Sequence, residues 1–335
     1  MSTNGSKNPF TDITAFGEIL IDFTYQGKNE KGISLFAQNP GGAPANVASA
    51  ARRLGARTAF VGKVGGDMHG RFLKEILDSE GIDTRGLVFD KDFFTTLAFV
   101  DLNGKGERTF SFARKPGADT RIEIGELCTD LIDGSRIFHI GSLSLTDEPS
   151  RSTTLYAVKR AKDKGSIISY DPNYRAALWT DEAAAKREMR SLIPFADIIK
   201  ISEEETKLLT DTQNPEQAAA ILCDKGVRIA LVTLGAKGAY LSCREKGGVY
   251  ASGFACDTVD TTGAGDAFLG AFLFKIAESR KYPQDVTLQE AASFARFANA
   301  AASLCVESYG AIPSMPSLDN VNKRLKNTAQ KTERE

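Results

Sequence analysis

The sequence has few of the residues that build metal centres or disulfide frameworks. It contains two histidines and five cysteines, and no CxxC or Cys/His spacing occurs among them. The cysteines are widely scattered: Cys128, Cys223, Cys243, Cys256 and Cys305. This excludes a His-rich metal site and a disulfide-based fold, and it favours a reducing, cytoplasmic compartment.

Long apolar runs and an excess of one charge are also absent. No apolar run approaches the roughly 20 residues that span a bilayer, and the polar residues 1–9 lack the apolar core of a signal peptide. The formal net charge is -1, so no overall field favours nucleic acid or an anionic membrane. We expect small-molecule partners, and neither nucleic acid nor membrane.

Two common nucleotide-binding motifs are missing. The segment Gly65–Gly70 approaches a Walker loop but is followed by Arg71-Phe72, not by the Lys-Ser/Thr pair that this mechanism needs. No GxGxxG motif follows a strand either. A nucleotide would therefore need a different cradle.

Apolar runs do alternate with amphipathic segments from about Phe138 onward. Strands are predicted at Ile137–Ile140, Ile167–Tyr170, Ile198–Ile201 and Ile229–Thr233. Helices are predicted at Arg151–Lys164, Glu182–Leu192 and Pro215–Lys225. Continuous apolar strands separated by helices indicate an α/β fold, a doubly wound parallel sheet with helices on both faces.

The N-terminal third follows a different pattern. Strands with period-two alternation are predicted at Ile19–Phe23, Ser34–Ala37, Leu97–Asp101 and Thr109–Ala113. Asn103–Gly106 would form the turn between the last two. We expect a small β-sheet lid, inserted around 17–40 and 95–115 into a single domain of residues 10–320. The ends, 1–9 and 321–335, are expected to be flexible.

Polar side chains follow three consecutive strands of the predicted sheet. Asp171 and Asn173 follow the second strand, Ser202 and Glu205 the third, and Thr233 ends the fourth. Ligands of open α/β sheets bind beyond the carboxyl ends of the strands. Each residue alone can be a helix cap or turn residue, but together they predict a common cleft.

The strongest local motif is Asp260-Thr261-Thr262-Gly263-Ala264-Gly265-Asp266, followed by an apolar helix. Small residues at a helix N-terminus expose backbone N–H groups that attract anions. Asp266 would lie beside this anion hole as a base. The alternative is a glycine-rich turn with Asp266 as an ordinary N-cap.

A second motif, Gly41-Gly42-Ala43-Pro44-Ala45-Asn46, leads into Val47–Leu54. Paired glycines let a ligand approach the backbone closely, and Asn46 offers a donor and an acceptor to a hydroxyl group. The alternative is a loop that simply enters a small-residue helix.

The two motifs together resemble the N-terminal and C-terminal signatures of PfkB-type carbohydrate kinases. The resemblance covers roughly residues 10–320 and implies a ribokinase-like fold and phosphoryl transfer from ATP to a sugar hydroxyl. By position it implies Asp266 as the base and Gly263, Ala264 and Gly265 as the anion hole. It also implies sugar contacts from Asp22, Gly41, Gly42 and Asn46, and nucleotide contacts from Thr233, Gly235, Gly238, Asn299 and Ser202.

The resemblance also implies metal ions. Many relatives carry Asn-x-x-Glu at the Mg²⁺-linked site, where this chain has Ser202-Glu203-Glu204-Glu205, so Glu205 is kept and Ser202 replaces the asparagine. Whether Glu205 reaches Mg²⁺ through water stays open. Asp260, Thr262, Gly310 and Ser314 occupy the positions where relatives bind K⁺; a Gly-Pro turn closing the domain is the alternative.

Three segments resemble the fructokinase branch of the family: Asp171–Arg175 with Leu178-Trp179, Glu107–Asp119, and Gln38–Pro40. Arg114 would then bind sugar hydroxyls and Arg175 would neutralise the transferring phosphate; surface ion pairs are the alternative for both. Fructose is the expected substrate, and a homodimer through the lid is expected. A 2-keto-3-deoxygluconate kinase, another sugar or nucleoside kinase of the family, and a non-catalytic binding protein remain the alternatives.

Overall fold

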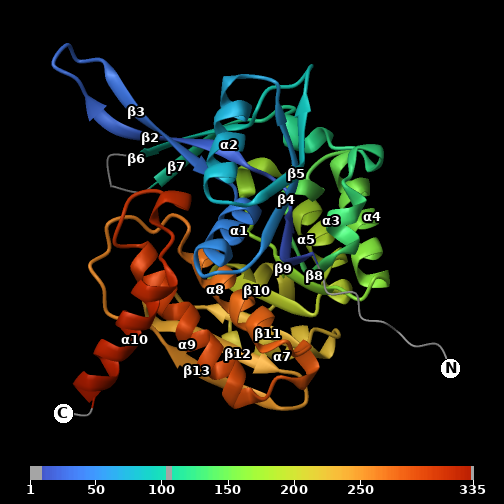
Figure 1. Cartoon of the computed structure of the whole chain (residues 1–335), viewed down its shortest axis with the longest axis vertical. Coiled ribbons are helices and arrows are strands. Elements are labelled where there is room, and N and C mark those ends of the chain that lie inside the picture. The colour runs from blue at the N-terminus through green and yellow to red at the C-terminus, as the bar shows by residue number, and fades with distance from the viewer. Residues whose placement is uncertain (1–9, 103–107, 333–335) are drawn as a thin grey trace.

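The architecture is described here from a computed structural model, which covers residues 10–102 and 108–332. Its large sheet has nine strands in the order β13-β12-β11-β10-β9-β8-β1-β4-β5 (Figure 1). These strands are β1 (Thr11–Phe16), β4 (Thr58–Gly65), β5 (Asp83–Asp90), β8 (Ser135–Gly141), β9 (Ile167–Asp171), β10 (Ile198–Ser202), β11 (Ile229–Thr233), β12 (Gly238–Cys243) and β13 (Gly247–Ser252). All neighbours are parallel except the β11–β12 and β12–β13 pairs. The predicted doubly wound α/β fold is confirmed.

Helices cover both faces of this sheet, because its central strands bury apolar side chains on both sides (Figure 1). One face packs against α1 (Ala43–Arg53), α8 (Ala264–Ser279) and α9 (Leu288–Cys305). The other packs against α3 (Thr129–Asp133), α4 (Ser150–Asp163), α5 (Glu182–Ser191), α6 (Thr206–Thr210) and α7 (Pro215–Asp224). Helix α2 (Met68–Ser79) covers β4 and β5. The chain winds outward in both directions from β1, so the order of strands reverses there, which is where ligands bind in such sheets.

A second, four-stranded sheet forms the lid. Its order is β3-β2-β6-β7, with β2 (Leu20–Lys28), β3 (Ser34–Gly41), β6 (Leu97–Leu102) and β7 (Arg108–Ala113). The β2–β3 hairpin projects well beyond the body of the molecule in Figure 1. The predicted lid strands are therefore present, while the predicted Asn103–Gly106 turn lies outside the described residues.

The C-terminal tail differs from the expectation of a flexible segment from residue 321. Helix α10 runs over Leu318–Thr332 and packs against α9. Val321 is fully buried, and Arg324 forms an ion pair with Glu307 at 2.8 Å. The charged composition of this segment suggests disorder, but its apolar residues lie on one side of an amphipathic helix that packs against α9. Residues 1–9 and 333–335 lie outside the described parts.

In the described segments, no helix combines the length and apolarity needed to cross a membrane.

Candidate active site

Close packing of α1 against α8 builds the centre of the site. A Cβ on Gly270 would lie 2.6 Å from the Ala50 Cβ and 2.7 Å from the Val47 carbonyl oxygen, so only glycine allows this approach. The approach brings the two signature motifs together. Asn46 Nδ2 of α1 donates to Asp266 Oδ2 of α8 at 2.7 Å, across 220 residues of sequence.

The first turn of α8 has the form of an anion hole. Gly263 is its N-cap in the left-handed region, with φ of 79°, and a Cβ there would lie 2.8 Å from the Ala311 side chain. No side chain caps the helix. The first-turn N–H groups of this 16-residue helix therefore face the site with the positive end of the helix dipole behind them.

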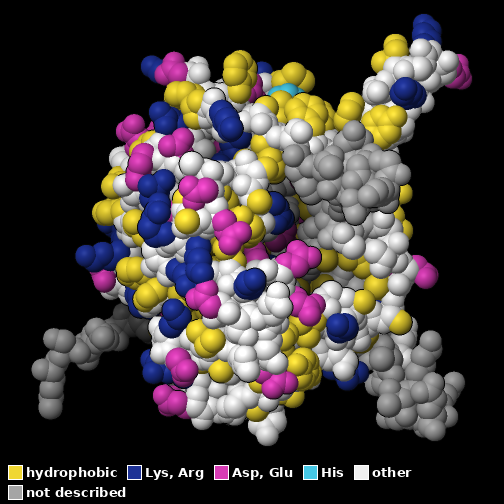
Figure 2. All heavy atoms as spheres, turned by 180° about the vertical axis from the view of Figure 1, so that it is seen from behind, with side chains coloured by type: hydrophobic (Ala, Val, Ile, Leu, Met, Phe, Trp, Pro, Cys, Tyr) yellow, Lys and Arg dark blue, Asp and Glu magenta, His cyan; other side chains and the backbone are white. Residues whose placement is uncertain are grey.

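An acidic cavity of about 460 Å³ lies between the lid and this helix end. A recess with acidic and basic side chains around it is visible in the middle of the face in Figure 2. The predicted residues Asp22, Gly42, Asn46, Gly263, Gly265, Asp266 and Arg175 all line the cavity. Gly41 does not line it; a Cβ there would collide with the Asp22 carboxylate, so Gly41 makes room for Asp22.

Burial changes the acidity of the carboxyl groups in this cavity. It raises the pKa of Asp266 to about 6, with the Asp171 charge adding to the rise and Lys200, Asn46 and Arg175 opposing it. Burial likewise raises the pKa of Asp22 to about 7, and that of Glu18 to about 7. The pKa of Asp266 therefore lies close to neutral pH, in the range that suits a general base.

A second cavity, of about 270 Å³, lies on the other side of Gly265. The predicted nucleotide residues Thr233, Gly235, Gly238 and Asn299 line it, together with Ala264 and Gly265. Asn299 Nδ2 donates to the carbonyl oxygens of Ala251 and Ser252, which fixes the end of β13 beside the cavity. Ser202 lies in an adjoining cavity that shares Thr233, Gly235 and Gly265.

Glu205 supports the backbone of this region. Its Oε1 accepts from Tyr174 N–H at 2.6 Å, and its Oε2 accepts from Ser202 N–H at 2.8 Å. Across residues 10–102 and 108–332, no cluster of three His, Cys, Asp or Glu side chains suits a metal ion. Mg²⁺ commonly binds one or two carboxylates together with water and substrate phosphates. The carboxylate of Glu205 and its neighbour Ser202 therefore fit a Mg²⁺ that is held largely by a nucleotide.

The four residues predicted to bind K⁺ come together beside α8. Asp260 Oδ1 accepts from the Thr262 N–H and hydroxyl, at 2.8 and 2.7 Å, and Oδ2 accepts from Gly310 N–H at 3.0 Å. Ser314 donates its hydroxyl to the Gly310 carbonyl at 2.6 Å. Carboxylate and carbonyl oxygens are the ligands of hard cations, so this donor set fits one.

Arg114 is not where the sequence predicts it. Its side chain is 3% exposed and forms an ion pair with Asp119 at 2.7 Å. It also donates to Thr146 Oγ1 and to the Leu143 carbonyl oxygen, each at 2.8 Å. Because these partners draw the guanidinium into the protein, Arg114 is absent from the cavity lining and supports the cavity wall at Leu143 instead.

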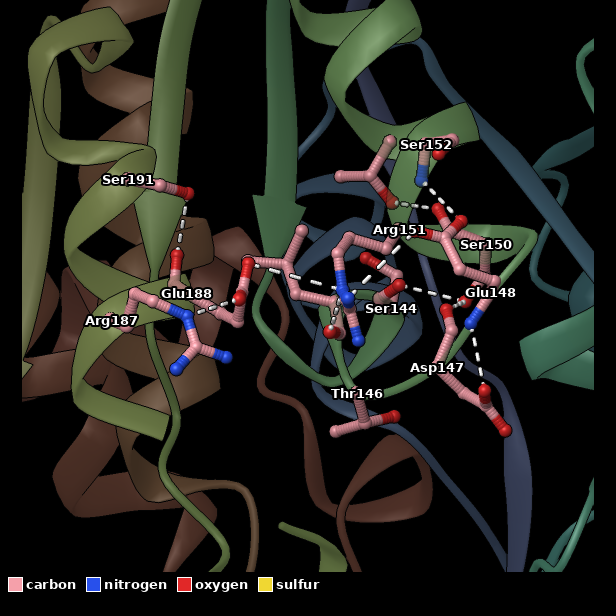
Figure 3. Close-up of polar contacts among 12 residues, drawn as sticks. Ser144, Thr146, Asp147, Glu148, Ser150, Arg151, Ser152, Arg187, Glu188 and Ser191 are labelled. Carbon is pink, nitrogen blue, oxygen red and sulfur yellow. Dashed lines mark hydrogen bonds and ion pairs between the residues drawn. The ribbon is translucent and has the colours of Figure 1, made fainter. Parts of the chain in front are cut away.

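The same wall is held from its other side by polar contacts at the start of α4 (Figure 3). Ser150 donates to the Ser144 carbonyl oxygen at 2.7 Å, and Arg151 Nε donates to that of Leu145 at 2.9 Å. Arg151 Nε also lies 3.9 Å from Glu188 Oε2 of α5. The Leu143–Leu145 turn is therefore held by Arg114 on one side and by the start of α4 on the other.

Sequence reasoning missed Glu18 and Lys200, which also line the acidic cavity. Glu18 Oε1 accepts from Ala43 N–H at 3.1 Å and so supports the double-glycine loop. A lysine inside the apolar stretch Ile198–Ile201 was the available signal for Lys200. A charged residue in a buried strand needs a partner or a function.

The comparisons with known proteins agree with this geometry. The profile described as pfkB family carbohydrate kinase matches residues 11–318. Fructokinase-2 of Solanum lycopersicum is 41% identical over 336 residues, covering 98% of this chain and 100% of its own. Probable fructokinase-7 of Arabidopsis thaliana is 43% identical over 333 residues, covering 97% of this chain and 96% of its own.

Solved structures give the same result. Fructokinase with bound ATP from Xylella fastidiosa is 34% identical, with a TM-score of 0.87 over 95% of this chain and 98% of its own. Fructokinase from Vibrio cholerae O395 with fructose, ADP and calcium is 34% identical, with a TM-score of 0.84 over 93% and 98%. The two predicted signatures, the fold and these relatives agree: the chain belongs to the pfkB family of carbohydrate kinases.

Proposed function

We propose that the protein is a fructokinase, which transfers the γ-phosphoryl group of ATP to a hydroxyl group of fructose. The observation that carries the proposal is the place of Asp266. Its carboxylate lies at the N-terminus of α8, between an acidic cavity suited to a sugar and a second cavity lined by the nucleotide residues. The similarity to fructokinases over nearly the whole chain supports the choice of substrate.

Phosphoryl transfer needs a general base and groups that stabilise the negative charge on the phosphoryl oxygens. Asp266 takes the proton from the sugar hydroxyl, whose oxygen forms a bond to the γ-phosphorus. The bond from that phosphorus to the β,γ-bridging oxygen breaks, and ADP leaves with the electron pair. Gly263, Ala264 and Gly265 present the α8 terminus to the charge that spreads over the phosphoryl oxygens, and Arg175, which lines the cavity, adds a cation.

Recognition of the sugar falls to the acidic cavity. Asp22 and Asn46 accept from and donate to sugar hydroxyls, while Gly42, with φ of 109°, keeps the backbone clear for the ring. Four carboxyl groups, of Glu18, Asp22, Glu204 and Asp266, line this cavity together with the cations Arg175 and Lys200. Arg114, the expected partner of the carboxylate of an acid such as 2-keto-3-deoxygluconate, is paired with Asp119 instead, which disfavours such a substrate.

Two ions complete the proposal. Mg²⁺, when bound with the nucleotide, neutralises phosphate charge; the adjoining cavity lined by Ser202, Glu204 and Glu205 is where this chain would hold it. The cluster of Asp260, Thr262, Gly310 and Ser314 would hold K⁺ beside the anion hole. Both assignments are supported by relatives solved with calcium or potassium.

We propose a cytoplasmic location as well. All five cysteines are free thiols, and Cys223, Cys243 and Cys305 are buried. Thiols in a chain with no disulfide suit a reducing compartment. Cell fractionation tests this: recovery of the protein in an oxidising compartment would contradict it.

We further propose a homodimer through the lid. The lid exposes large apolar side chains: Ile33 at 58%, Leu35 at 45%, Phe36 at 44% and Phe99 at 39%. Phe99 stacks on Phe23 at 5.3 Å, so these rings form one continuous apolar surface. A monomer rarely leaves such a surface in water.

Sedimentation velocity tests the dimer. The wild type should sediment as a dimer, and Phe36→Glu should sediment as a monomer, because a charge would then lie in the apolar contact. A change at the distant, exposed Tyr282, such as Tyr282→Glu, should leave the dimer intact. A monomeric wild type at micromolar concentration would contradict the proposal.

The kinase proposal is tested by release of ADP. Purified protein with Mg-ATP and K⁺ should release ADP rapidly only after fructose is added. Release of ADP at the same slow rate with and without sugar would favour a non-catalytic binding protein.

A further inference from the structure

Lys200 is a lysine in the interior of the sheet. It lies on β10 between Ile199 and Ile201, which point into the core under α4, α5 and α7. Successive side chains of a strand alternate, so Lys200 points to the opposite face, toward α8. Its side chain is 7% exposed. An ammonium group buried this deeply is costly unless it is paired.

The pairing is supplied by Asp171, the last residue of β9. Lys200 Nζ lies 2.7 Å from Asp171 Oδ2, and the Asp171 side chain is fully buried. Burial lowers the pKa of Lys200, but the carboxylates of Asp171, Glu205 and Asp266 outweigh it and raise the pKa above its usual value. His139 also lies close enough to feel the charge of Lys200, but it stays neutral, because burial lowers its pKa to about 3.

The ammonium lies against the anion hole. A Cβ on Gly265 would be 3.1 Å from Lys200 Nζ. Lys200 lines both the acidic cavity and the adjoining cavity of Ser202 and Glu205, so it stands where the two meet. Within the described parts of the chain, Asp171 is its one ion-pair partner. An ammonium has three N–H donors, which leaves donors for a ligand.

We propose that Lys200 is a further catalytic residue, whose ammonium binds a non-bridging oxygen of the phosphoryl group during transfer, while Asp171 holds it in place. The inference rests on the proposed kinase function. The phosphoryl group must pass the end of α8 on its way to the sugar, and a cation in a water-poor site stabilises the charge it carries there. The same cation also favours the ionised, basic form of Asp266.

Two measurements on Lys200→Met test this role. The first is kcat with fructose, which should fall by about 10²- to 10³-fold, the effect of removing one donor to a transition-state charge. The second is equilibrium binding of ATP and of ADP without sugar. ATP affinity should fall while ADP affinity, which lacks the γ-phosphate, changes little. A purely structural ion pair would weaken both nucleotides equally.

Further variants keep the test decisive. Lys200→Arg retains the charge and should recover part of kcat. If Lys200→Met does not fold, Lys200→Met combined with Asp171→Asn removes both buried charges and carries the same two measurements. Lys63→Met is the matched control, since Lys63 is equally buried and paired with Asp90 and Glu126 but lies outside the cavities. It should leave kcat and the ratio of ATP to ADP affinity unchanged.

The outcomes separate the two proposals. An inactive wild type contradicts the kinase function, and the nucleotide-binding comparison still tests Lys200. An active wild type together with a folded, fully active Lys200→Met contradicts the role of Lys200 alone. Equal loss of ATP and ADP affinity also overturns it.

Discussion

Asp266→Asn should lower kcat by about 10²-fold or more, because it removes the base that takes the hydroxyl proton. Shape is retained, since the Asn46 amide that donates to Asp266 Oδ2 at 2.7 Å can donate equally to an asparagine oxygen. Steady-state kinetics with fructose and Mg-ATP measure the loss. Near-normal turnover in a folded variant would rule out Asp266 as the base.

The fold should survive this change. The pKa of Asp266 is raised by burial to about 6, above its usual value of 3.8, so the folded state binds the proton more tightly than the unfolded state. The ionised carboxylate therefore costs stability above pH 6, and this cost disappears as pH falls toward 4. A neutral asparagine avoids the cost, and urea unfolding at pH 7 should give a free energy at least equal to that of the wild type.

The raised pKa of Asp266 also predicts how activity falls at acidic pH. In the wild type, kcat/KM for the sugar should fall as pH drops through about 6, because Asp266 becomes protonated. The residual activity of Asp266→Asn should lack this dependence. An identical acid limb in the variant would assign the titration to another group.

Arg114→Met should lower the free energy of unfolding by about 3–5 kcal/mol, since it leaves the buried Asp119 carboxylate without a counter-charge. Asp119 also accepts from Thr96 Oγ1 at 2.5 Å, so its position is fixed and it cannot turn to water. Chemical unfolding measures the loss. Arg85→Met, which breaks a solvent-exposed pair with Asp83, is the control and should change stability little.

A second variant separates charge from packing. Adding Asp119→Asn to Arg114→Met removes the orphaned carboxylate and should recover much of the lost stability. If Arg114→Met instead kept full stability and only raised KM for the sugar, the original prediction of a sugar contact would be right and the ion pair unimportant.

The parts of the site that the sequence predicts are those with local motifs. The glycines around Asp266 and before Asn46 are needed for local backbone conformations. Their structural role can therefore be predicted from the neighbouring residues alone. The strands are predicted equally well, because Ile167–Tyr170 and Ile198–Ile201 are apolar runs with clear ends. Strands β9 and β10 match these two ranges within one residue at each end.

Arg114, Lys200 and Glu18 could not be placed this way, because their roles depend on partners from other elements. Arg114 directly follows β7, and its contacts with Asp119 and the Leu143 carbonyl oxygen hold its guanidinium inside the protein. Lys200 meets Asp171 because β9 and β10 are neighbours in the sheet. The tail was misjudged for a related reason, since α10 gains its stability from packing on α9.

The substrate preference of the wild type tests the proposed fructokinase function most directly. Initial rates under Mg-ATP and K⁺ should be compared for fructose, ribose, adenosine and 2-keto-3-deoxygluconate. We expect the highest kcat/KM for fructose, because Arg114, the expected partner of the keto acid's carboxylate, is held in a buried ion pair with Asp119. A clear preference for 2-keto-3-deoxygluconate would contradict fructose as the substrate, and phosphorylation of none of the four would contradict the kinase function.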